Sequence, residues 1–163
     1  MDYRIIEKPA FDLVGKSCKF GVADDEIFRK ASKTWEAYTA TEEYEKLINM
    51  TNWQWGIVSE APVMSAYLAN ENGGFDPVVN AFGIEKTEDM DVKGFEVFHI
   101  PAATYAEFNC TLEKSSDTRH WIYTKWFPSS RYEHDSKGDI EAYFQVPLAW
   151  RVYARWWIPV IRK

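Results

Sequence analysis

The first half of the chain begins with two strand-like segments and continues into a helix. Tyr3–Lys8 and Phe11–Cys18 have strand-like patterns, and Pro9 interrupts the ladder between them, which predicts a hairpin or a bent strand pair. A helix is expected next, capped by Asp24 or Asp25. Its apolar positions recur at helical spacing at Ile27, Phe28, Ala31, Trp35 and Tyr38.

Further apolar positions predict one short helix and three strands before the middle of the chain. The short helix contains Tyr44, Leu47 and Ile48. The strands are expected at Trp55–Ser59, Val63–Ala69 and Asn80–Lys86. A polar run over residues 86–93 then divides the chain roughly in half.

The second half repeats the order of the first. Phe95–Ala102 matches Tyr3–Ala10 at a constant offset, and the same offset carries Cys18 onto Cys110. An interior proline and a cysteine that keep one register indicate an internal duplication.

The later segments complete the second unit. Ile140–Phe144 resembles Met64–Leu68, so the duplication extends into the later strands. A helix capped by Asp117 is expected to run to Phe127, where Pro128 and the following Ser129 and Ser130 end it. The last two strands are predicted at Asp139–Gln145 and Tyr153–Ile161.

These patterns predict an α+β fold. Two βαββ-type units, about residues 1–88 and 92–163, are expected to form a single domain over 1–163 with a pseudo-twofold axis. Their strands would make one antiparallel sheet that carries two main helices. Pockets concentrate at such internal interfaces, so we expect a central ligand groove at the seam between the halves.

Charge and cysteine content restrict the classes of function. The 163 residues carry a formal net charge of −6 with a pI near 5.1, so direct nucleic-acid binding is not expected. The chain has neither a membrane-length apolar run nor a signal-peptide pattern, which favours a cytoplasmic protein. Cys18 and Cys110 are too few for a disulfide framework and are expected to be reduced, buried thiols.

Motifs for metals and for catalysis are not found in the sequence. The histidines His99, His120 and His134 lack ligand spacing, and neither cysteine belongs to a CxxC pair, so no zinc site is expected. Phosphate-binding, dinucleotide-binding and nucleophile-elbow motifs do not occur either. We therefore expect no metal and no cofactor.

Aromatic residues are frequent: 8 Trp, 9 Tyr and 10 Phe make up 17% of the chain. Taken singly, Tyr38, Trp121 and Trp126 on inward helix faces are explained by core packing. Together with Trp55 and Tyr105, they exceed the number of rings that a small core buries, which predicts a ring-lined pocket. Such rings attract cations by roughly 0.5–2 kcal/mol each.

Glu141 is the candidate for the centre of this pocket. In a strand over Asp139–Gln145, alternation puts Glu141 and Tyr143 on one face. The matching residue of the first half is Ser65, so one ionisable group breaks the repeat. A carboxylate among rings loses hydration, which raises its pKa and marks it as a functional candidate. Alternatively, Glu141 faces solvent and pairs with a lysine or an arginine.

Several segments resemble the GyrI-like small-molecule-binding family, which includes the effector-binding domains of AraC-type and MerR-type multidrug regulators. The segments are Phe95–Phe108, Trp126–Glu133, Asp139–Tyr143 and Trp157–Val160. The resemblance implies a duplicated fold of SHS2 repeats with a groove for hydrophobic, often cationic, drugs and dyes. Because no helix-turn-helix pattern is found beside the domain, we expect the free-standing type of this family.

The resemblance also implies roles for single residues. Glu141 matches a buried glutamate that attracts cations, with Tyr143 beside it, and Trp157 matches an aromatic residue that lines the pocket. Family members often carry an acidic residue where this chain has Arg155. We therefore expect that Arg155 could neutralise Glu141 and shift the preference toward neutral or anionic ligands.

The expected function is binding of hydrophobic aromatic small molecules, cations among them, in the sensing or sequestration of a drug or toxin. The protein would be non-enzymatic, and the choice between monomer and homodimer stays open. One alternative is a hydrolase of cyclopropane-bearing genotoxins, with Glu141 as base and Tyr105 or Tyr143 as donor. A second alternative is a protein-binding regulator of the DNA gyrase type.

Overall fold

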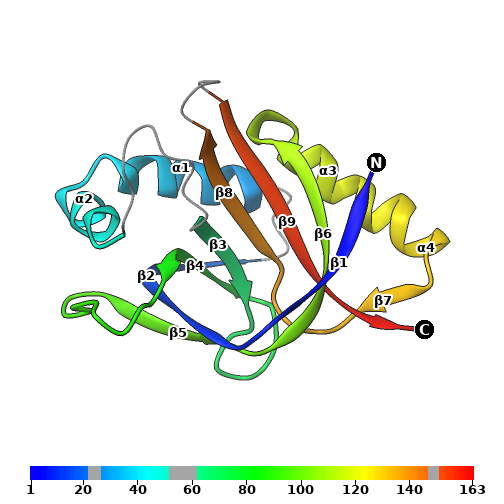
Figure 1. Ribbon diagram of the computed structural model, residues 1–163, viewed down its shortest axis with the longest axis horizontal. Helices are drawn as coiled ribbons and strands as arrows, with labels where there is room; N and C mark the ends of the chain where they lie inside the picture. The colour runs from blue at the N-terminus through cyan, green and yellow to red at the C-terminus, as the bar shows by residue number, and fades with distance from the viewer. Residues whose placement is uncertain (22–26, 52–61, 147–150) are drawn as a thin grey trace.

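The computed structural model describes residues 1–21, 27–51, 62–146 and 151–163, which form an α+β fold (Figure 1). The predicted caps Asp24 and Asp25 lie outside the described residues. The predicted strand Trp55–Ser59, with the candidate Trp55, lies outside them as well.

The elements of the first half follow the predicted order. The two opening strands and the two helices occur where the hydrophobic pattern placed them, and Pro9 stands between the strands. Thr41 caps the second helix, because its side chain accepts a hydrogen bond from the Tyr44 backbone N–H. The bounds are β1 (Tyr3–Lys8), β2 (Phe11–Phe20), α1 (Ile27–Thr39), α2 (Glu42–Asn49), β3 (Val63–Leu68) and β4 (Val78–Glu85).

The second half contains the same strands and a longer helical segment. After two strands, a 3₁₀ turn leads into a continuous run of α, π and α turns. The bounds are β5 (Glu96–Ile100), β6 (Ala103–Thr111), the 3₁₀ turn Leu112–Lys114, α3 (Ser115–Trp121), the π turn Ile122–Trp126, α4 (Phe127–Ser129), β7 (Tyr132–His134), β8 (Ile140–Val146) and β9 (Arg151–Arg162).

The start of this second helical segment differs from the prediction. The 3₁₀ turn after β6 starts α3 at Ser115, so Asp117 lies inside the first turn and does not cap it. A carboxylate is favourable there because the helix dipole places a partial positive charge at the amino end of a helix. The other end agrees with the prediction, because the helical segment stops at Ser129, directly after Pro128, and Ser130 is already extended. The short strand β7 was not predicted.

The strand order of the sheet is symmetric about its centre. The order is β1-β6-β9-β8-β3-β4-β2-β5, with β7 paired to β9, and neighbouring strands along this path are antiparallel. Strands β3 and β8, which match in the sequence repeat, are neighbours at the centre, where Ser65 lies opposite Glu141. This arrangement confirms the predicted class, with duplicated units about a pseudo-twofold axis.

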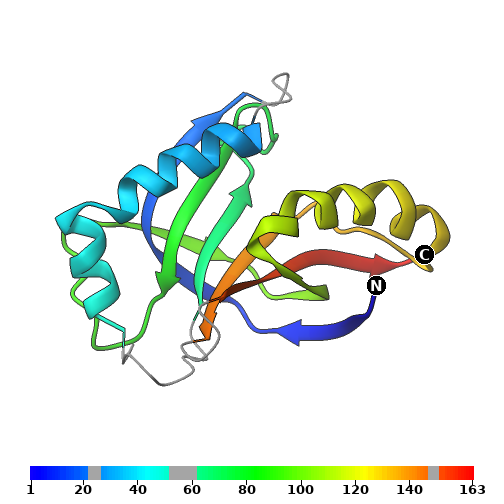
Figure 2. The same cartoon turned by 90° about the horizontal axis from the view of Figure 1, so that it is seen from above.

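Both main helices cover one face of the sheet. In Figure 2 the two halves of the sheet diverge, with α1 along the first half and α3 along the second. Trp35, Tyr38 and Phe82 pack beneath α1, and Phe108, Ile122 and Trp126 pack beneath α3.

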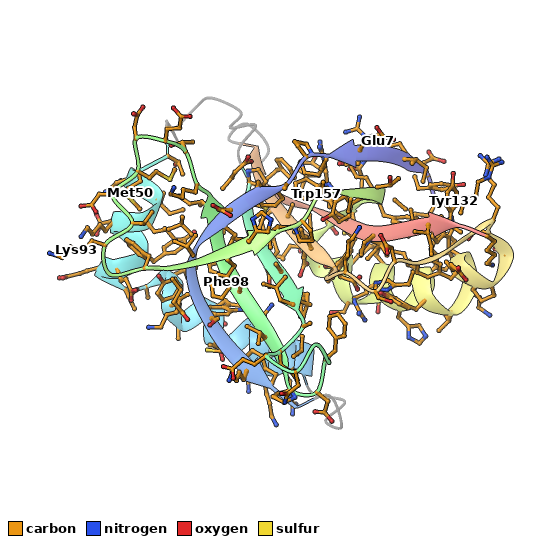
Figure 3. All side chains as sticks on the ribbon, turned by 90° about the horizontal axis from the view of Figure 1, so that it is seen from below. Glu7, Met50, Lys93, Phe98, Tyr132 and Trp157 are labelled. Carbon is orange, nitrogen blue, oxygen red and sulfur yellow. The ribbon has the colours of Figure 1, made fainter. Side chains whose placement is uncertain are left out.

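The face away from the helices has its own core. Its buried residues include Leu13, Met64, Tyr105, Ile140 and Trp157. Figure 3 looks onto this side, with β1, β2 and β5 in front and Phe98 and Trp157 labelled. The sheet therefore separates two apolar layers, and a strand residue belongs to one or the other according to its alternation.

Candidate functional site

A cavity of about 690 Å³ lies between α1 and α3, over the central strands of the sheet. Its walls come from both halves of the chain, so the predicted central groove is present. The aromatic lining residues are Trp35, Tyr44, Tyr67, Phe82, Tyr143 and Trp156. The polar ones are Ser32, Glu36, Thr39, Ser65, Ser115, Ser116 and Glu141.

The aromatic walls follow the internal repeat. Tyr67 and Tyr143 occupy matching positions on β3 and β8. Phe82 pairs with Ser65 across β4 and β3, as Trp156 pairs with Glu141 across β9 and β8. Each central strand therefore carries one ring, Tyr67 on β3 or Tyr143 on β8. Each also has a second ring on its outer neighbour, Phe82 on β4 or Trp156 on β9.

The first half supplies a neutral polar floor. The Asn80 amide donates to Ser65 Oγ at 2.9 Å, and the Trp35 indole donates to Asn80 Oδ1 at 2.5 Å. These groups are buried and hydrogen-bonded to each other, which satisfies their donors and acceptors without a charge. Trp35 in turn stacks on Phe82 at a centroid distance of 4.9 Å.

The second half supplies a buried carboxylate. Glu141 is only 6% exposed, which rules out the alternative of a solvent-facing strand residue. The Ser115 hydroxyl donates to Glu141 Oε1, and the Tyr143 hydroxyl donates to Oε2 at 2.7 Å. Among the described residues, no lysine or arginine forms an ion pair with it.

Burial raises the pKa of Glu141 above its usual value. The hydrogen bonds from Ser115 and Tyr143 lower it, as does the charge of Arg119, but these effects only partly oppose the rise. The pKa of Tyr143 is also well above its usual range, because of burial and the neighbouring carboxylate. Tyr143 therefore stays a neutral phenol that donates to Glu141. The carboxyl group of Glu141 therefore has hydrogen-bond donors but no ion-pair partner among the described residues.

The neighbouring Asp139 provides a contrast. This carboxylate is 4% exposed, but it receives hydrogen bonds from Arg119 at 2.9 Å, Tyr123 at 2.7 Å and His134 at 2.8 Å. Burial alone would raise the pKa of Asp139, and the hydrogen bond and charge of His134 with the charge of Arg119 outweigh that effect and lower it. Asp139 is thus fully compensated, whereas Glu141 is not.

Trp157, Arg155 and Tyr105 do not line the central cavity. Strand β9 turns Trp156 toward Glu141, so the adjacent Trp157 and Arg155 point to the opposite face, where Trp157 packs with Tyr105. Arg155 lies 3.7 Å from Glu107 and forms no ion pair with Glu141. The expected neutralisation of Glu141 by Arg155 is therefore wrong, as is the lining role of Trp157.

Three further candidates belong to the core beneath the helices. Tyr38 packs edge-on against Trp35, behind the cavity wall. Trp121 and Trp126 contact Phe108 edge-on. Core packing therefore explains all three residues, which is the interpretation that the sequence favours for each of them alone.

Sequence reasoning missed several lining residues. Tyr67 occupies the position in the first repeat that matches Tyr143 in the second. It could have been found by comparing each candidate residue with its counterpart in the other repeat. Trp156 needed the register between β8 and β9. Ser115 is the first residue of α3, and its contact with Glu141 joins residues 26 positions apart, so no local sequence pattern predicts it.

Other chemical possibilities are few. Within residues 1–21, 27–51, 62–146 and 151–163, no group of three or more His, Cys, Asp or Glu could hold a metal ion. Cys18 and Cys110 are free and half-buried. None of the helices described is both long and apolar enough to cross a membrane.

Comparison with known proteins identifies the family. The model of the integron-associated effector-binding proteins matches residues 4–160. Among curated protein sequences, none is similar enough to this chain to count as a match.

Three solved structures share the fold at low sequence identity. SAV2435 bound to tetraphenylphosphonium has a TM-score of 0.72 at 12% identity, covering 99% of this chain and 94% of that one. The integron cassette protein VCH_CASS2 from the mobile metagenome of Vibrio cholerae has 0.62 at 14%, covering 98% and 95%. The EcmrR C-terminal domain has 0.56 at 14%, covering 99% and 98%. Because the family model spans nearly the whole chain, this protein belongs to the integron-associated effector-binding proteins and has the GyrI-like fold that its sequence resembles.

Proposed function

We propose that the central cavity binds hydrophobic aromatic cations and that Glu141 is the counter-charge. The observation that carries the proposal is a buried carboxylate without an ion-pair partner among the described residues, in a cavity lined by rings. A drug or toxin of this class would be sensed or sequestered by the protein. Glu36, on α1 at the cavity wall, adds a second acidic side chain to the lining.

The physical basis is a charge in a medium of low polarity. A cation that enters the cavity loses hydration, and its attraction to Glu141 is stronger there than in water. Each ring face contributes roughly 0.5–2 kcal/mol more. Because a bound cation favours the ionised form of Glu141, its binding should release a proton when the raised pKa leaves that carboxyl protonated.

The similar fold of SAV2435 supports the choice of a probe. That protein was solved with tetraphenylphosphonium, a bulky aromatic cation. At 12% identity the likeness concerns the fold, so the ligand class of this chain rests on its own cavity. Tetraphenylborate has nearly the same shape with the opposite charge, which makes the pair a direct test of charge selection.

The test is a titration of tryptophan fluorescence with both ions at pH 8. We expect saturable binding of tetraphenylphosphonium, at least tenfold tighter than tetraphenylborate. Glu141→Gln should weaken the cation by about 10–100-fold, or roughly 1.4–2.7 kcal/mol. Glu113→Gln, an exposed change of the same charge next to Leu112 of the cavity wall, is the control and should change affinity less than twofold.

Equal affinity for the two ions, or no effect of Glu141→Gln, would contradict the proposal. Recovery of unchanged ligand after incubation separates a binder from the hydrolase alternative. The donor role of Tyr105 in that alternative is not supported, because Tyr105 is buried on the far face of the sheet.

A further inference from the structure

A second cavity, of about 440 Å³, lies on the sheet face opposite the central one. Strands from both halves contribute to it, and it shares no lining residue with the central cavity. Its volume falls in the range typical of small-molecule sites, roughly 300–1,000 Å³. It is therefore large enough for a two-ring ligand.

Positive charge collects at this cavity in an acidic protein. Arg4, Lys8 and Arg155 line it together with Glu85 and Glu107, three cations against two carboxylates, whereas the whole chain carries a net charge of −6. The local balance is thus opposite in sign to that of the molecule, and it favours an anion.

The buried carboxylate of this cavity is already compensated. Glu107 is 2% exposed and pairs with Arg4 at 2.5 Å, while the Trp157 indole donates to its Oε2 at 2.8 Å. Burial tends to raise the pKa of Glu107, and the hydrogen bonds of Arg4 and Trp157 with the charge of Arg155 outweigh it and lower the pKa. Glu107 therefore needs no cation from a ligand, in contrast to Glu141.

Two cations of the cavity have donors to spare. The side chain of Lys8 forms no ion pair or hydrogen bond with any described residue, and its ammonium lies 4.2 Å from the centre of the Trp157 ring. Arg155 is 3.7 Å from Glu107, too far for a hydrogen bond, and lies 4.4 Å from the centre of the Phe144 ring. Both cations are held on ring faces with N–H groups still available.

Apolar surface completes the lining. Trp157 and Phe144 meet edge to face at 6.4 Å, and Phe11, Met64 and Ile6 lie around them. A ligand that matches this lining has an aromatic body and a single negative charge, since the two nearby carboxylates disfavour a multiply charged anion.

We propose that this second cavity binds an aromatic monocarboxylate, with the carboxylate held by Lys8 and Arg155 and the ring packed against Phe144 and Trp157. The protein then has two sites of opposite charge preference on the two faces of one sheet. The second site does not depend on the function proposed for the central cavity.

The probe is 1-naphthoate, titrated by calorimetry and followed through the indole N–H resonances in ¹H–¹⁵N spectra. Trp157 reports on the second cavity through its bond to Glu107, and Trp156 reports on the central one through its 3.0 Å bond to the Ser115 carbonyl. Each resonance is assigned by its loss in a Trp→Phe variant. We expect saturable binding that shifts the Trp157 resonance more than that of Trp156.

Lys8→Met should weaken 1-naphthoate by about tenfold and leave tetraphenylphosphonium affinity unchanged. Lys16→Met is the matched control, because Lys16 also lies over a ring, that of Tyr38 at 5.4 Å, but outside this cavity. Arg155→Gln is a second variant and should weaken 1-naphthoate to a similar extent. Absence of saturation, a larger shift of Trp156, or equal effects of Lys8→Met and Lys16→Met would each overturn the proposal.

Discussion

Replacing Glu141 by glutamine should stabilise the protein without ligand, although it disables the proposed site. Glutamine has nearly the same volume, so the packing is kept while the charge is removed and one acceptor oxygen becomes an amide nitrogen. A buried ion costs several kcal/mol of hydration. The amide oxygen still accepts from one of the two hydroxyls of Ser115 and Tyr143, and the other hydroxyl has to turn and accept from the amide nitrogen; each change costs about 1 kcal/mol.

The sign of the balance follows from the raised pKa of Glu141, since burial outweighs its hydrogen bonds in the folded protein. Below the unfolded value of about 4.5 the carboxyl is protonated in both states, so wild type and Glu141→Gln should be about equally stable. As the pH rises through the raised pKa, the folded wild type loses stability relative to the variant. We expect the variant to be more stable by about 1–2 kcal/mol at pH 8.

The assay is thermal unfolding of both proteins from pH 4 to pH 8. About 1 kcal/mol corresponds to roughly 2–4 °C for a domain of this size, so a rise in Tm of about 2–8 °C is expected at pH 8, shrinking toward zero at pH 4. Glu113→Gln on the surface should change Tm by less than about 2 °C. A lower Tm for Glu141→Gln at pH 8, or a difference that does not vary with pH, would refute the reasoning.

Three further outcomes are expected. Asp139→Asn should destabilise the protein by about 3–5 kcal/mol in urea unfolding at pH 7, because the buried residue 139 then loses the charge that accepts hydrogen bonds from Arg119, Tyr123 and His134. Wild-type stability should also fall at acid pH, where Asp139 with its lowered pKa becomes protonated; a loss under 1 kcal/mol for the variant would contradict this. Tyr143→Phe removes a hydrogen bond that lowers the pKa of Glu141. The midpoint of the pH dependence of tetraphenylphosphonium affinity should therefore move to higher pH, and an unchanged midpoint would argue against that hydrogen bond. Tyr38→Phe should be neutral or stabilising by up to about 1 kcal/mol, since the buried Tyr38 hydroxyl has no hydrogen-bond partner among the described residues, and a clear loss in Tm would show a missed partner.

Local patterns in the sequence carried much of the fold. The strands around Pro9 and the helix of Trp35 and Tyr38 were predicted correctly, because alternation and helical spacing act over a few residues. The offset match of Cys18 and Cys110 indicated the duplication, and the sheet order then follows the repeat. Sequence reasoning failed at the start of α3 and at β7, since both depend on how the chain leaves its neighbouring strands.

The same distinction applies to the candidate site. Glu141 and Tyr143 were assigned to one face from a single strand, and the hydrogen bond between them agrees with that. The burial of Glu141 and its contact with Ser115 come from tertiary packing.

Which of the neighbouring residues Trp156 and Trp157 lines the central cavity could not be predicted from the sequence. The sequence alone determines that these adjacent residues of a strand face opposite sides. Only the pairing of β9 with β8 and β6 decides that Trp156 meets Glu141 and that Arg155 and Trp157 meet Glu107. Register between strands is a contact over long sequence separation, and a shift by one residue exchanges the two faces. The tertiary structure therefore decided which cavity each charged and aromatic residue serves.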